Sequence, residues 1–238
     1  MKPFIYLNIW VTKTMNFDKD IFIIIKEAIK LNNALVIKNN DSLSLIDDQK
    51  AGIYYICVNS LDLDVFSLIL EGKQKENTVA VISELDLDIG VIKEFEHTLK
   101  VKQFVYKGNR FIINSKYTIL PFSISDLPYL KSHYFRMGDD EHYFLSAIER
   151  GMLKAINEKG EIIGFIGEHP EHALGMLYID ENYRRQGVGK ALEMTMINKF
   201  IDEGKVPFDH VVVDNDKSLH LQNSLGMIPS LGNIYWYF

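Results

Sequence analysis

The chain has 238 residues, of which 47% are apolar and 24% are charged, the composition of a globular protein with one large or two small domains. Its net charge of −6 disfavours binding to duplex nucleic acid, which usually needs a basic surface. The single cysteine, Cys57, excludes an internal disulfide and is expected to be a buried structural thiol. Because no signal-peptide pattern and no apolar run of membrane-spanning length are visible, a soluble cytoplasmic protein is expected.

The first half of the sequence alternates between strand-like and helix-like patterns. Asp18 is a candidate N-cap for a first helix, and Asn39, Asn40 and Asp41 form a turn signal that joins two strands in a hairpin. Strands are predicted at residues 4–11, 34–38, 42–46, 52–58, 78–82 and 101–106, and helices at residues 18–31, 64–70 and 89–99.

The second half shares the order of elements of the first, although no repeat of the residues themselves is visible. Asp126 and Pro128 mark one helix start, and Asp139 and Asp140 mark another. Strands are predicted at residues 117–123, 152–156, 162–167, 174–179, 208–213 and 233–238, with further helices after residue 190 and at residues 217–225. We therefore expect two α/β units, at residues 1–115 and 116–238.

The stretch YIDENYRRQGVGKAL, residues 178–192, places two glycines between an apolar strand and a helical pattern. A Walker A loop would need Ser or Thr at Ala191, and a dinucleotide fingerprint would need glycine at Leu192. Glycines let the backbone approach a ligand closely, and the N–H groups at a helix N-terminus attract anions. The residues alone predict an anion site with phosphate as the expected ligand, and a plain strand-to-helix loop is the alternative.

The same stretch resembles the acetyl-CoA-binding motif of the GNAT acyltransferases, Arg/Gln-x-x-Gly-x-Gly/Ala, at Arg184, Gly187 and Gly189. Downstream, residues 213–227 (VDNDKSLHLQNSLGM) resemble the strand–Asn–helix–Leu-Gly-Phe segment of that family. The resemblance covers residues 116–238. It implies the GNAT fold, an α/β (α+β) architecture with a mixed central sheet flanked by helices, and transfer of an acetyl group from acetyl-CoA to an amine.

The resemblance also implies where coenzyme A binds. Its pantetheine arm would insert between the parallel strands at residues 174–179 and 208–213, and the Leu177 N–H would stabilise the oxyanion that develops during attack. The other implied contacts to the cofactor come from the strand end, the Gly-rich loop and the last helix: Tyr178, Ile179, Arg184, Arg185, Gln186, Gly187, Val188, Gly189, Lys190, Asn215 and Ser218.

The sequence departs from the family at both positions that often transfer protons. A strand glutamate that often acts as the base corresponds to Ala173, and a tyrosine that often protonates the thiolate corresponds to Gln222. Glutamine donates a hydrogen bond but supplies no proton. Either Tyr178 or a water acts as the acid, or protonation is unimportant because the thiolate leaves well enough without it. The nearby substitutes for the base are Glu168, Glu171 and His172. Of these, His172 has the most useful intrinsic pKa, and a solvated loop histidine is the alternative.

The expected acceptor is a small-molecule amine or an amino acid, with no metal, nucleic acid or membrane partner. The acidic residues 138–142 could attract a cationic amine, but a capped helix start with acidic residues at its positive end is the favoured interpretation. The aromatic residues 235–238 could wall the acceptor pocket or form a strand edge packed on the core.

The first half is expected to bind no coenzyme A, because residues 59–64, after its third strand, contain carboxylates and no glycine. A degenerate, GNAT-like first domain resembles the glycine N-acyltransferase-like branch of the family. A different class of function remains open, a non-catalytic module that binds or senses coenzyme A, because the usual base and acid are missing.

Overall fold

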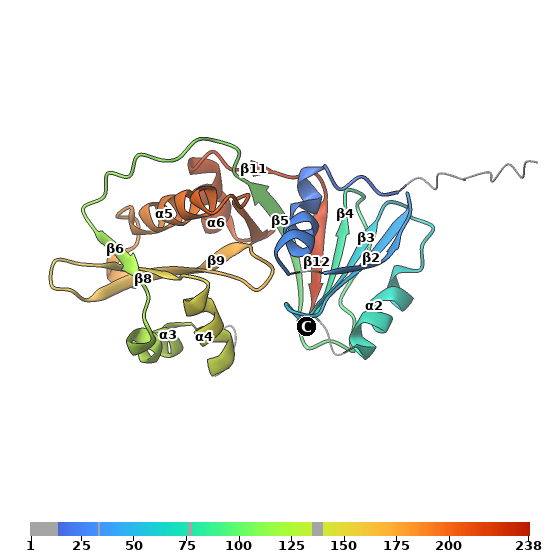
Figure 1. Ribbon diagram of the computed structural model, residues 1–238, viewed down its shortest axis with the longest axis horizontal. Coiled ribbons are helices and arrows are strands. Elements are labelled where there is room, and N and C mark those ends of the chain that lie inside the picture. Colours follow the sequence, from blue (N-terminus) through green and yellow to red (C-terminus); the bar gives the residue numbers. More distant parts are fainter. Residues whose placement is uncertain (1–13, 33, 76–77, 135–139) are drawn as a thin grey trace, which may run out of the picture.

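The structure, a computed structural model, describes residues 14–32, 34–75, 78–134 and 140–238. One mixed sheet runs through both halves of the chain, and helices cover both of its faces (Figure 1). The strand order is β1-β2-β3-β4-β12-β5-β10-β9-β8-β7-β6, and the short strand β11 pairs with β5. The predicted α/β architecture with a mixed central sheet is confirmed.

The first half begins with a helical segment made of η1 (Asp20–Phe22), α1 (Ile23–Glu27) and the π-helical turn η2 (Ala28–Asn32). The strands that follow are β1 (Leu35–Asn39), β2 (Leu43–Asp48), β3 (Ile53–Val58), β4 (Thr78–Ser83) and β5 (Thr98–Val105), with helix α2 (Val65–Gln74) between β3 and β4. The predicted β1–β2 hairpin is confirmed. Its turn is closed by Asn40, whose Oδ1 accepts hydrogen bonds from the N–H groups of Ser42 and Leu43.

Two predictions for the first half are wrong, and a third lies outside the described residues. Residues 84–97 contain no regular helix, because Ile92 and Phe95 are buried under the sheet by an irregular segment, where Phe95 contacts Tyr237 at 5.5 Å between ring centroids. Asp18 does not cap the first helix but pairs with Lys26 at 3.2 Å. The strand expected at residues 4–11 falls in the part of the chain that the structure does not describe.

The second half follows the predicted order. Asp140 is the N-cap of α4 and Glu141 lies in its first turn, as the predicted capped helix start requires, whereas Gly138 and Asp139 fall outside the described residues. The strands are β6 (Thr118–Pro121), β7 (Leu153–Ile156), β8 (Ile162–Glu168), β9 (Leu174–Ile179), β10 (Phe208–Val212), β11 (Ile228–Pro229) and β12 (Asn233–Tyr237). The helices are η3 (Ile124–Asp126), α3 (Leu127–His133), α4 (Glu141–Glu149), η4 (Glu181–Tyr183), α5 (Val188–Asp202) and α6 (Asp216–Ser224). Helices α3 and α4 cover one face of the sheet, and α5 and α6 cover the other (Figure 1).

The strand β12 does not lie beside the other strands of the second half. It fills the space between β4 and β5 and is antiparallel to both, while β5 is antiparallel to β10 of the second half. Each half therefore contributes a strand to the other, an arrangement that we call the strand exchange. The aromatic residues of β12 form a central strand rather than the expected edge, and Trp236 and Tyr237 are 8% and 0% exposed.

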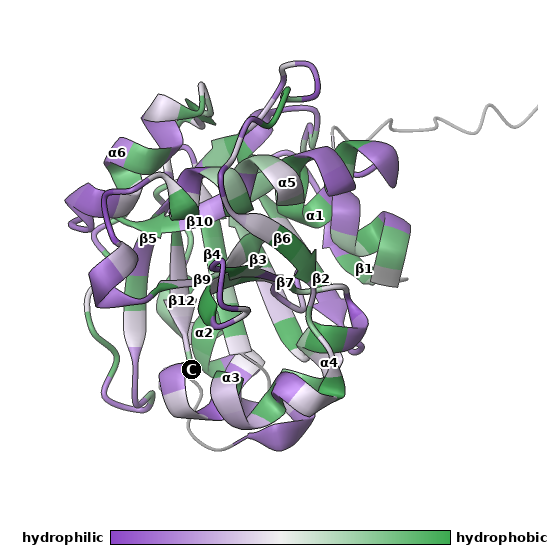
Figure 2. Ribbon diagram, turned by 90° about the vertical axis from the view of Figure 1, so that its left-hand side faces the viewer, coloured by the Kyte–Doolittle hydropathy of each residue, from purple (hydrophilic) through white to green (hydrophobic). Residues whose placement is uncertain are grey.

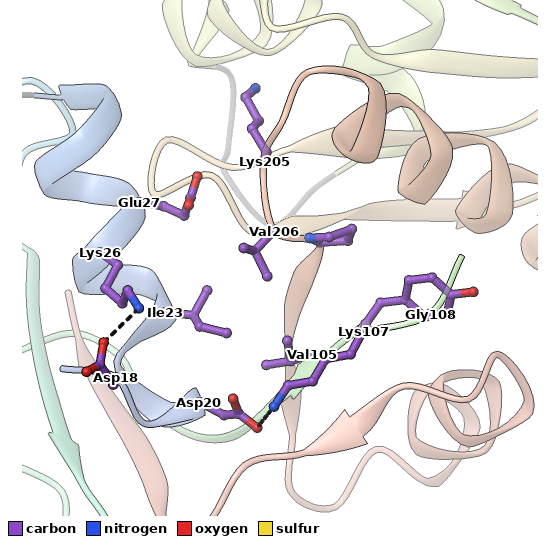
Figure 3. A pocket seen from close by; sticks show the side chains of 12 residues that line it. Asp18, Asp20, Ile23, Lys26, Glu27, Val105, Lys107, Gly108, Lys205 and Val206 are labelled. Atoms are coloured by element: carbon purple, nitrogen blue, oxygen red, sulfur yellow. Dashed lines mark hydrogen bonds and ion pairs between the residues drawn. The ribbon is translucent and has the colours of Figure 1, made fainter. Parts of the chain in front are cut away.

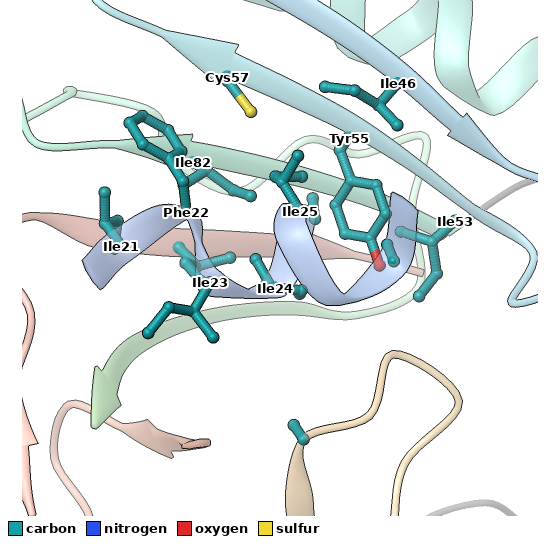
Figure 4. Close-up of a cluster of buried hydrophobic side chains, with 14 of the residues drawn as sticks. Ile21, Phe22, Ile23, Ile24, Ile25, Ile46, Ile53, Tyr55, Cys57 and Ile82 are labelled. Carbon is teal, nitrogen blue, oxygen red and sulfur yellow. The ribbon is translucent and has the colours of Figure 1, made fainter. Parts of the chain in front are cut away.

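The buried core continues across the two halves. Ile21, Ile24 and Ile25 of the first helical segment pack against Tyr55 and Cys57 of β3 in a cluster (Figure 4) that also includes Ala173 and Phe208 of the second half. Cys57 is fully buried, which raises the pKa of its thiol and confirms the predicted structural role. The hydrophobic residues gather between the sheet and its helices (Figure 2). None of the helices in the described ranges is long and apolar enough to cross a lipid bilayer.

Candidate functional site

Residues 184–190, which we call the anion loop, lead from the end of β9 into helix α5. Arg185 and Gly187 adopt left-handed conformations, with φ of 59° and 84°. Gly187 is the N-cap of α5 and offers no side chain to the helix. In the described part of the chain, the backbone N–H groups of residues 185–190 donate no hydrogen bond of good geometry. Because the helix dipole adds positive potential there, this loop is suited to bind an anion.

Side chains of the anion loop hold its shape. Arg184 donates from Nε to the carbonyl of Ile179 at 3.0 Å and pairs with Glu181 at 3.1 Å. Gln186 donates from Nε2 to the carbonyl of Asn182 at 2.7 Å. Arg184 therefore fixes the loop to the end of β9. In the described ranges, Arg185 and Lys190 form no ion pair and can face an anion, although Lys190 Nζ also donates to the carbonyl of Ser224 at 3.1 Å.

A cleft of about 600 Å³ borders the anion loop. One wall contains Gln186, Gly187 and Lys190, and the other is formed by residues 112–117, which connect the two halves of the chain. The cleft provides room for a large, phosphate-bearing ligand beside the N–H groups of the loop.

The parallel strands β9 and β10 separate as they approach the anion loop. They pair at a single position, Leu174 with Asp209. On its other side, β9 carries a bulge against β8, with Met176 in a left-handed conformation at φ 52°. The bulge places one extra residue before Leu177 and leaves part of the strand without regular pairing. We call the space between the separating strands the wedge. Its closed end is at Leu174, and its open end faces the anion loop.

The corresponding elements of the first half have neither feature. Strands β3 and β4 are parallel and pair at five positions, so they do not separate. Helix α2, which follows β3, is capped by Asp64, whose Oδ1 accepts from the Ser67 N–H at 3.1 Å. A carboxylate therefore occupies the helix N-terminus where an anion would have to bind.

Comparison with known proteins identifies the family of the second half, which contains the anion loop and the wedge. Residues 114–227 match the model of the acetyltransferase (GNAT) family. This part of the chain belongs to the GNAT family. None of the curated proteins compared matches the chain.

Solved structures show that the likeness in fold extends beyond the GNAT domain. A GNAT-family protein from Novosphingobium aromaticivorans is 12% identical, with 92% of this chain and 96% of that chain covered and a TM-score of 0.57. A Drosophila protein is 16% identical, with 88% and 76% covered and a TM-score of 0.57. A conserved protein of unknown function from Staphylococcus epidermidis is 10% identical, with 87% and 95% covered and a TM-score of 0.52. At these identities, the likeness concerns the fold alone.

In the GNAT domain, His172 lies in the turn between β8 and β9, with φ 67°, and only 9% of the residue is exposed. It is therefore not a solvated loop histidine. Its Nδ1 is 2.5 Å from Oε1 of Glu168, which is fully buried and also accepts from Lys205 Nζ at 3.0 and 3.1 Å. Burial raises the pKa of Glu168, but the hydrogen bond with His172 and the charge of Lys205 outweigh it and hold the pKa below its usual value.

The third substitute for the base, Glu171, lies in the same turn and approaches strand β10. Its Oε1 is 3.9 Å from Nδ1 of His210, and the two side chains are 12% and 8% exposed. Burial, together with the charge of His169, lowers the pKa of His210 to about 3, so this imidazole is neutral at physiological pH. Sequence reasoning missed His210, because a single histidine in a strand belongs to no motif.

Gln222 lies on helix α6, with its amide directed at two buried acids. Nε2 donates to Oδ2 of Asp209 at 2.6 Å and to Oε1 of Glu193 at 3.0 Å. We call Asp209 and Glu193 the carboxyl pair. The other oxygen of each acid and the oxygen of Gln222 are buried and have no partner in the described ranges. Burial raises the pKa of both acids, and the charge of Glu193 raises that of Asp209 further.

We expect Glu193→Gln to reduce the loss of stability that the wild type suffers between about pH 4.5 and 7. The pKa of Glu193 is raised from 4.5 to about 7 in the folded state, so the unfolded chain releases its proton first as the pH rises, and the free energy of unfolding falls. The shift corresponds to about 3 kcal/mol. Urea denaturation at both pH values measures the effect, with Glu149→Gln, an exposed carboxylate on α4, as control. An unchanged pH dependence in Glu193→Gln would contradict the assignment.

The remaining predicted site residues lie on different faces of the sheet and on helix α6. Leu177 and Ile179 pack toward the α5 side of the sheet, whereas Tyr178 stacks on Phe165 at 5.2 Å on the α3–α4 side. Asn215 caps α6, accepting from the Ser218 N–H at 3.3 Å. The structure thus gathers the predicted cofactor residues around the wedge and the anion loop. His172 is bound to Glu168 in the β8–β9 turn, and Gln222 is bound to the carboxyl pair.

A second cavity, of about 400 Å³, lies between α1 and residues 205–207 at the junction of the halves (Figure 3). Lys26 pairs there with Asp18 at 3.2 Å, and Lys107 pairs with Asp20 at 2.7 Å. Because these charges are already paired and the cavity borders neither the wedge nor the anion loop, we assign it no ligand.

Proposed function

We propose that the protein transfers an acetyl or other short acyl group from acyl-CoA to the amine of a small molecule or an amino acid, by direct attack of the amine. One observation carries this proposal. The GNAT domain combines an uncapped helix N-terminus with a separated pair of parallel strands, whereas the first half has a capped helix and a closed strand pair. A single coenzyme A per chain is the expected stoichiometry.

Different groups around the wedge would bind different parts of coenzyme A. The N–H groups of the anion loop, with Arg185 and Lys190, would hold the pyrophosphate of coenzyme A, and backbone groups near Ile179 would pair with its arm. Bound acyl-CoA supplies the thioester that the amine attacks. The N–H of Leu177, next to the bulge, would donate to the oxygen that becomes negative during this attack.

The amine has to lose a proton to attack, and Glu171 and His172 are the candidate bases. Glu171 has the more suitable position. It lies beside neutral His210 and accepts no hydrogen bond from a lysine of the described ranges, whereas His172 is bound to Glu168. We expect Glu171→Gln to lower kcat by about 10²–10⁴-fold, the usual range for loss of a general base. His172→Gln is the comparison in the same assay. Full activity of Glu171→Gln together with loss of activity in His172→Gln would reverse the assignment.

A screen of amines and amino acids for release of coenzyme A from acetyl-CoA tests the proposal. Turnover of any acceptor well above background hydrolysis supports an acyltransferase. Ala173 at the position of the family's glutamate and the engagement of Gln222 with two acids favour a second candidate, a protein that binds coenzyme A without catalysis. Tight binding of acetyl-CoA with no turnover across the whole panel would favour that candidate.

A further inference from the structure

The carboxyl pair lies at the closed end of the wedge. Asp209 is paired with Leu174, the last contact before β9 and β10 separate. From Leu174 to Ile179, strand β9 extends five residues, or about 16 Å. This length is comparable to that of an extended pantetheine arm. An arm that starts at the anion loop and follows β9 past Ile179 therefore carries its sulfur into the part of the wedge between Leu177 and Asp209.

The surroundings of the carboxyl pair favour a bound proton. The neighbours of Asp209 on the adjacent strands are Phe104 of β5 and Leu174 of β9, and the polar groups that meet it from the helices are Glu193 of α5 and Gln222 of α6. Neither acid has an ion-pair partner in the part of the chain described. Two carboxylates that share one amide in a buried site cannot both be ionised without a large cost, so one of them keeps its proton.

The unpartnered oxygens show where such a proton can reside. Gln222 satisfies Oδ2 of Asp209 and Oε1 of Glu193, and it leaves Oδ1 and Oε2 without a donor. A protonated carboxyl carries its O–H on one of these atoms. Gln222 cannot supply a proton itself, but it holds the two acids in contact with the same amide and so allows them to share one.

We propose that Asp209 is the acid that protonates the sulfur of coenzyme A as it leaves, and that Glu193 shares and restores this proton. The inference rests on the proposed acyl transfer. As the bond between nitrogen and the acyl carbon forms, the carbon–sulfur bond breaks and its electron pair stays on sulfur, which takes the proton from Asp209. The proton that the amine loses passes to its base and balances the one that Asp209 gives, and the carboxyl pair takes up a proton again before the next turnover.

The test compares Asp209→Asn with the wild type in the full-length protein. Asparagine keeps the size of the side chain and an oxygen that can accept from Gln222, but it has no acidic proton. We expect kcat to fall by about 10²–10⁴-fold, while the dissociation constant of coenzyme A changes less than about threefold. Asp202→Asn, the same change at an exposed site on α5, is the matched control and should behave like the wild type.

A pH profile separates proton transfer from a structural role. In the wild type, kcat should fall at alkaline pH as the carboxyl pair loses its proton. Glu193→Gln should move this limb to lower pH, because the charge of Glu193 then no longer raises the pKa of Asp209, an effect that a packing defect would not produce. An alkaline limb that is the same in wild type and Glu193→Gln, or full kcat in Asp209→Asn, would overturn the inference while acyl transfer itself stands.

An infrared measurement that needs no turnover completes the test. A protonated carboxyl should give its carbonyl stretch at neutral pH in the wild type, and the double variant Asp209→Asn, Glu193→Gln should lack this band. Absence of the band from the wild type would overturn the inference. Failure of the wild type to use any acceptor would instead reject the proposed function, whatever the state of the carboxyl pair.

Discussion

The two halves of the chain, produced as separate fragments of residues 1–115 and 116–238, are expected to be insoluble alone and to form a folded one-to-one complex when produced together. The strand exchange is the reason. Fragment 116–238 lacks β5, the partner of both β10 and β12, and fragment 1–115 lacks β12, which joins β4 to β5. Each fragment is therefore expected to lose the whole free energy of unfolding, which is about 5–15 kcal/mol for an ordinary domain.

The size of this effect follows from what β12 buries. Ile234, Tyr235, Trp236 and Tyr237 are each 8% exposed or less, and in an isolated second half they would lie in water. Solubility, circular dichroism and gel filtration measure the outcome. The control is the full chain cut at a protease site inserted between residues 107 and 116, where the fragments should remain associated. A soluble, monomeric fragment 116–238 that binds acetyl-CoA would contradict the expectation and restore the second half as an independent domain.

Gly187→Asp is expected to weaken binding of acetyl-CoA by at least about 100-fold, which corresponds to about 2.7 kcal/mol. The substitution places a carboxylate beside the N–H groups that would hold the pyrophosphate, and it forces a side chain into a left-handed conformation at φ 84°. Isothermal titration calorimetry with acetyl-CoA measures the loss, and thermal unfolding checks that the fold remains.

The chain offers a close control in Gly204→Asp. Gly204 also has a left-handed conformation, at φ 68°, and a side chain at either glycine would meet open space. Gly204, however, follows the C-terminal end of α5, far along the helix from the anion loop. Equal loss of binding in the two variants, or none in Gly187→Asp, would show that the anion loop does not hold the cofactor.

The sequence predicted those features that depend on neighbours in the chain. Period-two and period-3.6 patterns located most strands and helices, and the two glycines with the following helix located the anion loop, because both signals act over a few residues. The helix expected at residues 89–99 failed for a related reason. Its apolar residues have helical spacing, but they are buried by tertiary contacts with β12, which no local pattern records.

Features that join distant residues were beyond such reasoning. The carboxyl pair brings Asp209 and Glu193 together from β10 and α5, and only the fold shows that Gln222 of α6 reaches both. The departure at Gln222 could be read from the family pattern, but its new partners could not. The strand exchange was hidden in the same way, since the order of strands along the chain is compatible with two separate sheets.

The position of β12 also bears on how the protein is made. Ile234 is paired with Ile82 and Val101, so the first half lacks a central strand until the ribosome has released residues 233–237. Until then, β4 and β5 have no neighbour between them, and their apolar edges are open to wrong partners. Folding of the first half is therefore expected to wait until β12 has been made, and newly made chains should depend on chaperones more than the modest size of each half would suggest.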